Sequence, residues 1–122
     1  MKHLNYQTLQ DLNYDGYLLN EAPERVLQFG EGNFMRAFVD FFIDKMNETA
    51  NFNSKVVLVQ PIPKFTTPDV GDFINEQEGL YTLYLRGSEN GQEVSSKRVI
   101  SCISRCLNAY SDYEAVMECA KN

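Results

Sequence analysis

The segment from Val26 to Ala37, VLQFGEGNFMRA, constrains the fold more than any other part of the chain. A short apolar run leads into a Gly-x-Gly turn, and an amphipathic stretch follows directly. Gly30 can adopt backbone angles closed to residues with a Cβ atom, and Gly32 leaves room for the backbone to approach a ligand. The pattern predicts a strand, a tight turn and a helix whose free N–H groups and positive dipole end favour a diphosphate.

The glycine pattern alone leaves two interpretations open. In the common G-x-G-x-x-G motif a third glycine would stand where this chain has Met35, so the strand and the helix would pack less closely than in a standard dinucleotide fold. The first interpretation is a nucleotide-binding loop. The second is that the two glycines only turn a strand into a helix.

The stretch from Asn33 to Glu48 predicts a helix packed on a sheet, because its polar residues recur with a period near 3.6. The polar stripe consists of Arg36, Asp40, Asp44 and Asn47, and the apolar residues are Phe34, Phe38, Phe41, Phe42 and Met46. We expect the apolar face to meet the sheet and Arg36 to form a surface ion pair with Asp40. The functional alternative for Arg36 is a cation close to a bound phosphate.

Two apolar runs flank this helix. Arg25 to Phe29 predicts a short buried strand, and the β-branched run from Lys55 to Gln60 is typical of a parallel strand covered on both faces. Strand, turn, helix and second strand make a βαβ unit. Because only two parallel strands are identified, we expect an incomplete dinucleotide fold, which is the front part of a larger protein.

The remaining segments predict mostly loops and a hairpin. Residues 1–24 are expected to be an irregular leader, and the acidic stretch after Pro61, with Asp69, Asp72, Glu76 and Glu78, a solvated loop. Leu80 to Arg86 and Val94 to Ile103 are expected to pair around Asn90-Gly91 through a connection longer than two residues. Ser111 and Glu114 fit a capping box of a final helix.

The composition restricts the function classes open to the chain. A formal net charge of −6 without clustered Lys and Arg argues against nucleic-acid binding. No apolar run approaches the ~18 residues that span a bilayer, and the polar N-terminus lacks the apolar core of a secretory signal. We therefore expect a cytoplasmic protein without a membrane partner.

The cysteines and the histidine exclude several kinds of catalytic site. Cys102, Cys106 and Cys119 are odd in number and lack zinc-ligand spacing, so we expect buried thiols in a reducing compartment, although Cys102 and Cys106 stand four apart as on one helical face. His3 is the only histidine, which rules out a His-based triad or a His-rich metal site within this chain. No metal ligand is predicted.

With these motifs in place, the chain resembles the polyol-specific long-chain dehydrogenase family, which includes mannitol dehydrogenases and hexuronate reductases. The resemblance rests on the turn from Gly30 to Ala37, on the run GLYTLYLRG from Gly79 to Gly87, and on the strand at Val99 to Ser101. Met35 stands where the mannitol and fructuronate enzymes more often carry a histidine. The motifs look most like the hexuronate reductases that interconvert tagaturonate and altronate.

The resemblance implies a fold, a cofactor and a reaction. The fold class is α/β, with residues 25–122 as the N-terminal part of a Rossmann-like NAD-binding domain that joins a βαβ unit and an antiparallel hairpin in a mixed sheet. The reaction is an NAD-dependent, metal-independent hydride transfer to a small sugar acid. The general-base lysine of this family lies in a C-terminal domain outside this chain, so no catalytic residue is expected here and the chain alone is expected to be inactive.

The predicted cofactor-binding residues follow from the same motif. They are Gly30, Glu31, Gly32, Asn33, Phe34, Arg36, Ala37 and Gln60. NAD-selective sites commonly place an acid at the end of the second strand, where it bonds the ribose 2′-OH. Gln60 holds that position here and can bond a ribose, but it does not repel a 2′-phosphate.

Two other classes of function remain open. The chain can be a non-catalytic nucleotide-binding or protein-interaction module, because missing parallel strands leave a sheet edge that invites pairing. It can also be a methyltransferase-like domain, which opens with a similar glycine turn. Gln60 argues against the methyltransferase, since that class needs an acid at the end of the second strand.

Overall fold

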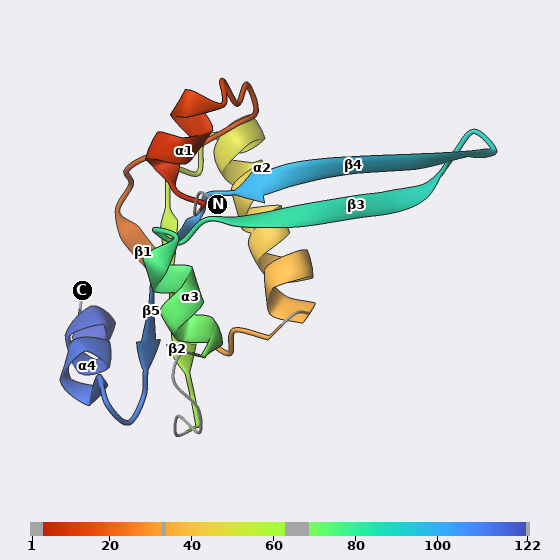
Figure 1. The fold of residues 1–122 in the computed structure, drawn as a ribbon. Coiled ribbons are helices and arrows are strands. Elements are labelled where there is room, and N and C mark those ends of the chain that lie inside the picture. Colours follow the sequence, from red (N-terminus) through yellow and green to blue (C-terminus); the bar gives the residue numbers. More distant parts are fainter. Residues whose placement is uncertain (1–3, 33, 63–68, 122) are drawn as a thin grey trace.

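The computed structural model describes residues 4–32, 34–62 and 69–121. A parallel sheet with the strand order β1-β2-β5 consists of β1 (Glu24–Phe29), β2 (Lys55–Gln60) and β5 (Ile103–Asn108). The antiparallel pair β3 (Tyr81–Glu89) and β4 (Gln92–Ile100) extends from the body as a long arm (Figure 1). The helices are α1 (Tyr6–Asp11), α2 (Asp40–Ala50), α3 (Val70–Glu76) and α4 (Tyr113–Lys121), and a π-helical turn, Met35–Val39, leads into α2.

The centre of the domain is β2, in which all six residues are buried. Val56 and Leu58 pack with Ile43 of α2 and Ile74 of α3 on one face of the sheet. The alternate residues Val57 and Val59 pack with Leu107 and with Val116 of α4 on the other face. This alternation confirms the predicted strand covered on both faces, and β1-α2-β2 confirms the predicted parallel βαβ unit.

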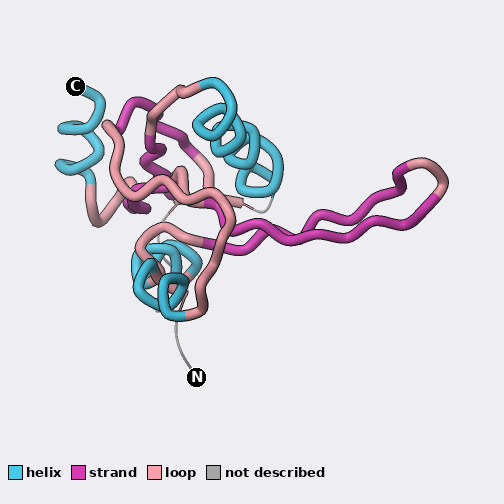
Figure 2. Tube along the Cα trace, turned by 90° about the horizontal axis from the view of Figure 1, so that it is seen from above, coloured by secondary structure: helices cyan, strands magenta, loops and turns pink. Residues whose placement is uncertain are grey.

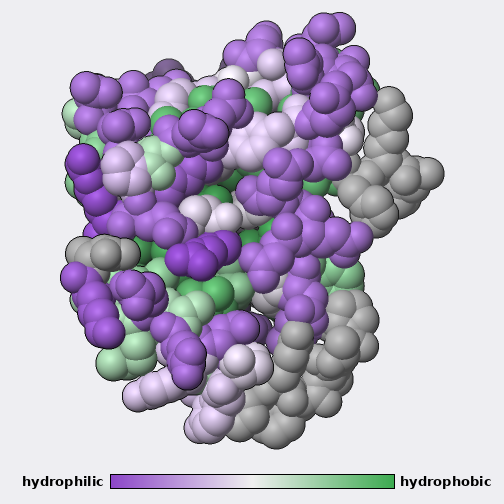
Figure 3. Space-filling model, turned by 90° about the vertical axis from the view of Figure 1, so that its left-hand side faces the viewer, coloured by the Kyte–Doolittle hydropathy of each residue, from purple (hydrophilic) through white to green (hydrophobic). Residues whose placement is uncertain are grey.

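Figure 2 shows α4 and α2 on either side of the parallel strands, with the arm pointing away from all of them. The side of the molecule seen in Figure 3 is mostly hydrophilic, and its hydrophobic areas are small and lie between polar side chains. The domain therefore has a three-layer body from which one hairpin extends.

The C-terminal half differs from the prediction in its strands. The hairpin is confirmed, but it forms a sheet of its own instead of joining a mixed sheet. The predicted strand from Val94 to Ile103 is wrong as one element, since β4 ends at Ile100 and a third parallel strand, β5, begins at Ile103. The chain changes sheets at Ser101 and Cys102, where the Ser101 N–H donates to Asp44 and the Val56 N–H donates to the Cys102 carbonyl.

Two smaller expectations about this half also have clear outcomes. The connection between β3 and β4 is the dipeptide Asn90-Gly91 alone, with φ angles of 54° and 79°, so the longer connection was wrong. Both φ angles are positive, as a tight two-residue hairpin turn requires. The buried thiols are confirmed for Cys102 and Cys106, and Cys106 lies in a strand, not on a helical face.

Two segments expected to be irregular contain short helices. In the N-terminal leader, Asn5 caps α1 by accepting the Thr8 N–H at 2.7 Å, and Leu9 is buried against Leu80 and Val99. In the acidic stretch, Asp69 and Asp72 form a reciprocal capping box at the start of α3. Capping satisfies backbone N–H groups that a short helix cannot pair internally, which is why these polar residues begin helices here.

The orientation of α2 is opposite to the prediction. Its polar residues Asp40, Asp44 and Asn47 are buried, whereas large apolar residues are exposed, namely Phe34 (70 %), Phe38 (50 %), Phe42 (51 %) and Met46 (40 %). The buried polar groups have matching partners: Asn47 bonds the N–H and the carbonyl of Ser54. The exposed rings pack on one another, with 5.3 Å between the centroids of Phe34 and Phe38.

Asp44 connects α2 to the arm. Its carboxylate is fully buried and lies 2.7 Å from the Arg98 guanidinium of β4, and it also accepts the Ser101 N–H at 3.0 Å. Arg98 pairs at the same time with Glu48, one turn along the helix, at 2.8 Å. Removing the arginine leaves a buried carboxylate without its cation, which is among the costliest changes in a folded protein.

We predict that Arg98→Met lowers the free energy of unfolding by about 3 kcal/mol in a urea titration, because Asp44 stays buried without its cation. The control is Lys97→Met, on the adjacent and exposed residue of β4, which should change it by less than about 0.5 kcal/mol. Equal effects of the two variants would contradict this assignment.

Candidate functional site

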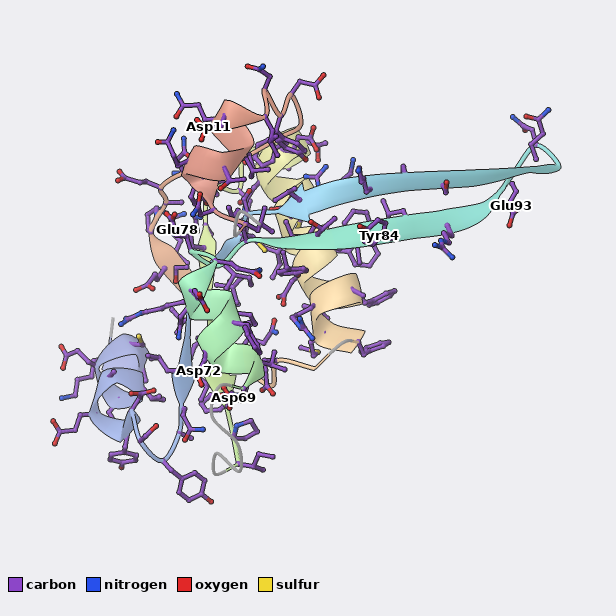
Figure 4. The ribbon with its side chains drawn as sticks, viewed as in Figure 1. Asp11, Asp69, Asp72, Glu78, Tyr84 and Glu93 are labelled. Atoms are coloured by element: carbon purple, nitrogen blue, oxygen red, sulfur yellow. The ribbon has the colours of Figure 1, made fainter. Side chains whose placement is uncertain are left out.

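The candidate site lies at the carboxyl ends of the parallel strands. The register places Phe29 beside Val59 and Gln60 beside Asn108, so the loops that leave β1, β2 and β5 begin at one edge of the sheet. Figure 4 shows Asp69 and Asp72 at this end of α3 and Glu78 at the other end. In open α/β sheets ligands bind in the crevice outside this edge.

The glycine turn joins β1 to the helix at this edge. Gly30 has a φ of +120°, which L-residues rarely adopt, and its N–H donates to the Val59 carbonyl at 2.8 Å. A Cβ atom at Gly32 would meet nothing within 4 Å, so this side of the turn is open. The Gly32 carbonyl accepts the Arg36 N–H at 3.1 Å and begins the helix. The predicted strand, turn and helix are confirmed.

Arg36 folds back on the turn. Its Nε donates to the Glu31 carbonyl at 2.8 Å, and its guanidinium lies 5.9 Å from the centroid of the Tyr81 ring. The expected surface ion pair with Asp40 is wrong as a surface feature, because Asp40 is fully buried. The positive charge of Arg36 still acts on Asp40 and lowers the pKa of that carboxyl.

Gln28 and Asp40 lie directly behind the turn. Gln28 of β1 is 6 % exposed, and its Nε2 donates to the Gly30 carbonyl at 3.0 Å and to Asp40 Oδ2 at 3.2 Å. Burial raises the pKa of Asp40 to about 6, against the lowering effects of the Gln28 hydrogen bond and of Arg36. Sequence reasoning missed this pair. The available signal was a single amide inside an apolar strand two residues before the glycine.

A second contact fixes the first turn of the helix from the arm. The Tyr81 hydroxyl donates to the Arg36 carbonyl at 2.6 Å, and burial, followed by the negative charge of Asp40, raises the pKa of that phenol well above its ordinary range. The Cys102 thiol donates to the Asp40 carbonyl at 3.2 Å. The irregular first turn is thus held by β1, by β3 and by the segment before β5.

The other predicted site residues fall in two groups. Phe34 and Ala37 are exposed beside the turn, and Asn33 lies outside the described residues. Gln60 is 8 % exposed at the end of β2, and its Nε2 donates to Asp69 Oδ2 at 3.1 Å. The structure therefore brings Gly30, Glu31, Gly32 and Arg36 together, whereas the amide of Gln60 faces the start of α3.

Two depressions lie at opposite ends of the strands. One, of about 500 Å³, is largely apolar and lies at the carboxyl end, lined by residues that include Phe29, Pro61, Tyr110, Tyr113 and Met117. The other, of about 920 Å³, lies at the amino end beside Tyr6 and Lys55. The Lys55 ammonium donates to the Tyr6 hydroxyl at 3.0 Å and to the Ser101 carbonyl at 2.7 Å, so it already has partners within the fold.

The described segments offer no alternative kind of site. They contain no group of three or more His, Cys, Asp or Glu side chains placed to hold a metal ion. No helix in them is both long and apolar enough to cross a membrane. The glycine turn and the apolar depression at the carboxyl edge are therefore the features to explain.

A parallel sheet with helices on both faces and a glycine turn at its carboxyl edge define a Rossmann-type α/β domain. Comparison with protein families agrees, since residues 24–122 match the family model described as the mannitol dehydrogenase Rossmann domain. The chain belongs to the mannitol dehydrogenase family. The predicted fold class and the resemblance are confirmed.

Curated relatives narrow the similarity. The chain is 44 % identical over 117 residues to the altronate oxidoreductase of Bacillus subtilis, covering 93 % of this chain and 23 % of that protein. It is 46 % identical over 113 residues to the altronate oxidoreductase of Phocaeicola vulgatus, again covering 93 % and 23 %. The chain thus spans less than a quarter of the length of these relatives.

Solved structures share the same fold. A D-sorbitol dehydrogenase in substrate-free form superposes with a TM-score of 0.75 at 23 % identity, covering 95 % of this chain and 24 % of that one. Pseudomonas fluorescens mannitol 2-dehydrogenase, in a ternary complex with NAD and D-mannitol, gives 0.72 at 26 % identity, covering 96 % and 24 %. The family is one of oxidoreductases, and the second neighbour has NAD bound.

The raised pKa of Asp40 predicts a pH-dependent stability. The unfolded chain ionises this carboxyl near pH 4, whereas the folded chain does so only near pH 6, so its contribution to stability falls as the pH rises between these values. Asp40→Asn removes the titration, and its stability relative to the parent chain should rise by about 2 kcal/mol from pH 4 to pH 7. Urea titrations across this range measure the difference. A constant difference would show that Asp40 titrates normally.

Proposed function

We propose that this chain is the NAD-binding N-terminal part of an oxidoreductase that interconverts tagaturonate and altronate in hexuronate catabolism. The observation that carries the proposal is the open glycine turn at the carboxyl end of β1, which leads directly into a helix. The names of the relatives, altronate oxidoreductases at 44 % and 46 % identity, support the substrate class. The natural partner is then a small sugar acid, and the enzyme is cytoplasmic.

The turn suits a dinucleotide diphosphate. Backbone groups of Gly30, Glu31, Gly32 and Phe34 would face it, with Ala37 leaving space on the next turn, because nothing lies within 4 Å of a Cβ atom built at Gly32. The N-terminal end of the helix adds partial positive charge. Asn33 keeps its predicted role in this loop. Arg36 would contribute mainly by closing the turn through the Glu31 carbonyl.

The rest of the edge suits an adenosine. The apolar depression beside Phe29, Tyr110 and Tyr113 has a size and character suited to an adenine ring. Gln60 presents the Asp69 carboxylate at the end of β2, so negative charge lies where a ribose 2′-phosphate would bind in NADP. This supports NAD over NADP more directly than Gln60 alone did in the sequence.

The chemistry divides between the cofactor and the protein. When bound, NAD accepts the hydride from the alcohol carbon of altronate and NADH returns it to the ketone carbon of tagaturonate. The described residues would hold and orient the dinucleotide. No described residue is assigned as general base, a role that we place in the part of the relatives' length that this chain does not span.

A second candidate function is a non-catalytic interaction module. It is favoured by the exposed aromatic surface of Phe34, Phe38 and Phe42 and by an edge of β1 that has no partner among the described strands. The two candidates differ in their response to a dinucleotide.

We predict saturable binding of NADH to the 122-residue chain, followed by calorimetry, with weaker binding of NADPH because of Asp69. Gly32→Val should abolish binding by filling the open side of the turn while leaving the thermal midpoint nearly unchanged. Gly87→Val, in the exposed arm, is the control that should bind as the parent does. A well-folded parent chain that binds no NADH would favour the interaction module.

We further predict that the purified chain does not form NADH from altronate and NAD, because it supplies a cofactor site without a general base. Absorbance at the nicotinamide band measures the reaction, and the full-length Bacillus subtilis relative serves as the active control. Measurable turnover by the 122-residue chain would overturn the division of labour proposed above.

A further inference from the structure

We infer that Gln28 and Asp40 are a positioning pair that fixes the glycine turn in the conformation that receives a ligand. Neither side chain belongs to the glycine motif, and neither faces the open side of the turn. The inference relies on the proposed function for the identity of the ligand. The effect on the backbone of the turn is a separate claim and can be measured without any ligand.

The geometry of Gln28 connects the two ends of the turn. One amide N–H of its side chain donates to the carbonyl of Gly30, where the strand ends, at 3.0 Å. The same nitrogen donates to Asp40 Oδ2, in the helix that follows, at 3.2 Å. Both side chains are buried, so water does not compete for these bonds. A single amide thus couples the strand, the glycine and the helix.

Two atoms of the pair indicate a role other than stability. Gln28 Oε1 and Asp40 Oδ1 are both buried and have no hydrogen-bond partner among the described residues. Unsatisfied buried polar atoms are costly, and an apolar pair of the same size would avoid the cost. Their presence beside the turn is explained if the donors of Gln28 are needed to hold the Gly30 carbonyl in place.

The pair also explains why the helix turns its polar stripe inward at this point. Asp40 can accept from Gln28 only if it faces β1, and the neighbouring apolar residues Phe38 and Phe42 then face outward, as observed. Arg36, on the same turn, is held from outside by Glu31 and Tyr81. The turn is therefore supported on its inner side by Gln28 and Asp40 and on its outer side by Arg36.

The test measures amide hydrogen exchange at Gly30 and Arg36, whose N–H groups bond to Val59 and Gly32 on either side of the open turn. Gln28→Met keeps the size of the side chain and removes the amide. We expect exchange at these two amides to become at least tenfold faster, and NADH affinity at least tenfold weaker, while protection in β2 and β5 is retained. Asp40→Leu should have the same local effect.

Asp40→Asn provides the rescue. Its amide oxygen still accepts from Gln28 Nε2, and its amide nitrogen supplies a donor for Gln28 Oε1, so exchange and NADH affinity should stay within twofold of the parent chain. The matched control is Asn47→Leu, which removes a buried amide from the same helix at Ser54, away from the turn. That variant should leave the relative exchange of Gly30 and Arg36 unchanged.

Several results would overturn the inference. They are unchanged exchange at Gly30 and Arg36 in Gln28→Met, exchange that rises equally in β2 and β5, or an equal local effect of Asn47→Leu. If the parent chain binds no NADH but Gln28→Met still releases the two amides, the proposed cofactor fails and the positioning pair stands. If NADH binds and Gln28→Met changes neither readout, the pair fails and the cofactor stands.

Discussion

The structure depends on the burial of β2 on both of its faces. A strand with six buried residues must be covered by helices on two sides, and its hydrogen-bonding edges must be met by β1 and β5. These requirements place α2 and α3 on one face and α4 on the other. They also align the ends of the three strands, which brings the glycine turn, Gln60 and the loop after Asn108 to one edge. The candidate site is therefore a consequence of how the central strand is buried.

Buried polar contacts then determine how the outer elements attach to this sheet. Asp44 joins α2 to Arg98 of the arm and to Ser101, where the chain passes from one sheet to the other. Lys55 joins α1 to the same place through Tyr6 and the Ser101 carbonyl. Asp40 and Gln28 join the helix to the turn. Such contacts require matched partners, so they specify one arrangement of the helix and the arm on the sheet more narrowly than apolar packing does.

The sequence predicted the parts that depend on local patterns. The run before Gly30, the turn and the β-branched strand at Val56 to Val59 are periodic and continuous, and the βαβ unit followed from them. The orientation of α2 could not be predicted, because periodicity separates two faces of a helix without saying which one is buried. The buried acids have partners, Arg98 and Ser101, that lie more than fifty residues away in the chain. β5 was missed because Ile103 to Asn108 includes Ser104 and Arg105 and continues directly from a predicted hairpin strand.

The central claim is that the carboxyl edge of the parallel sheet holds a dinucleotide. The most direct test is ¹H–¹⁵N chemical-shift mapping of the labelled chain during addition of NADH. The account predicts that the perturbed amides cluster at Gly30, Gly32 and Phe34 and at the ends of β2 and β5, including Ala109. Perturbations centred on Tyr6, Lys55 and Glu78, around the depression at the amino end of the strands, would contradict the account.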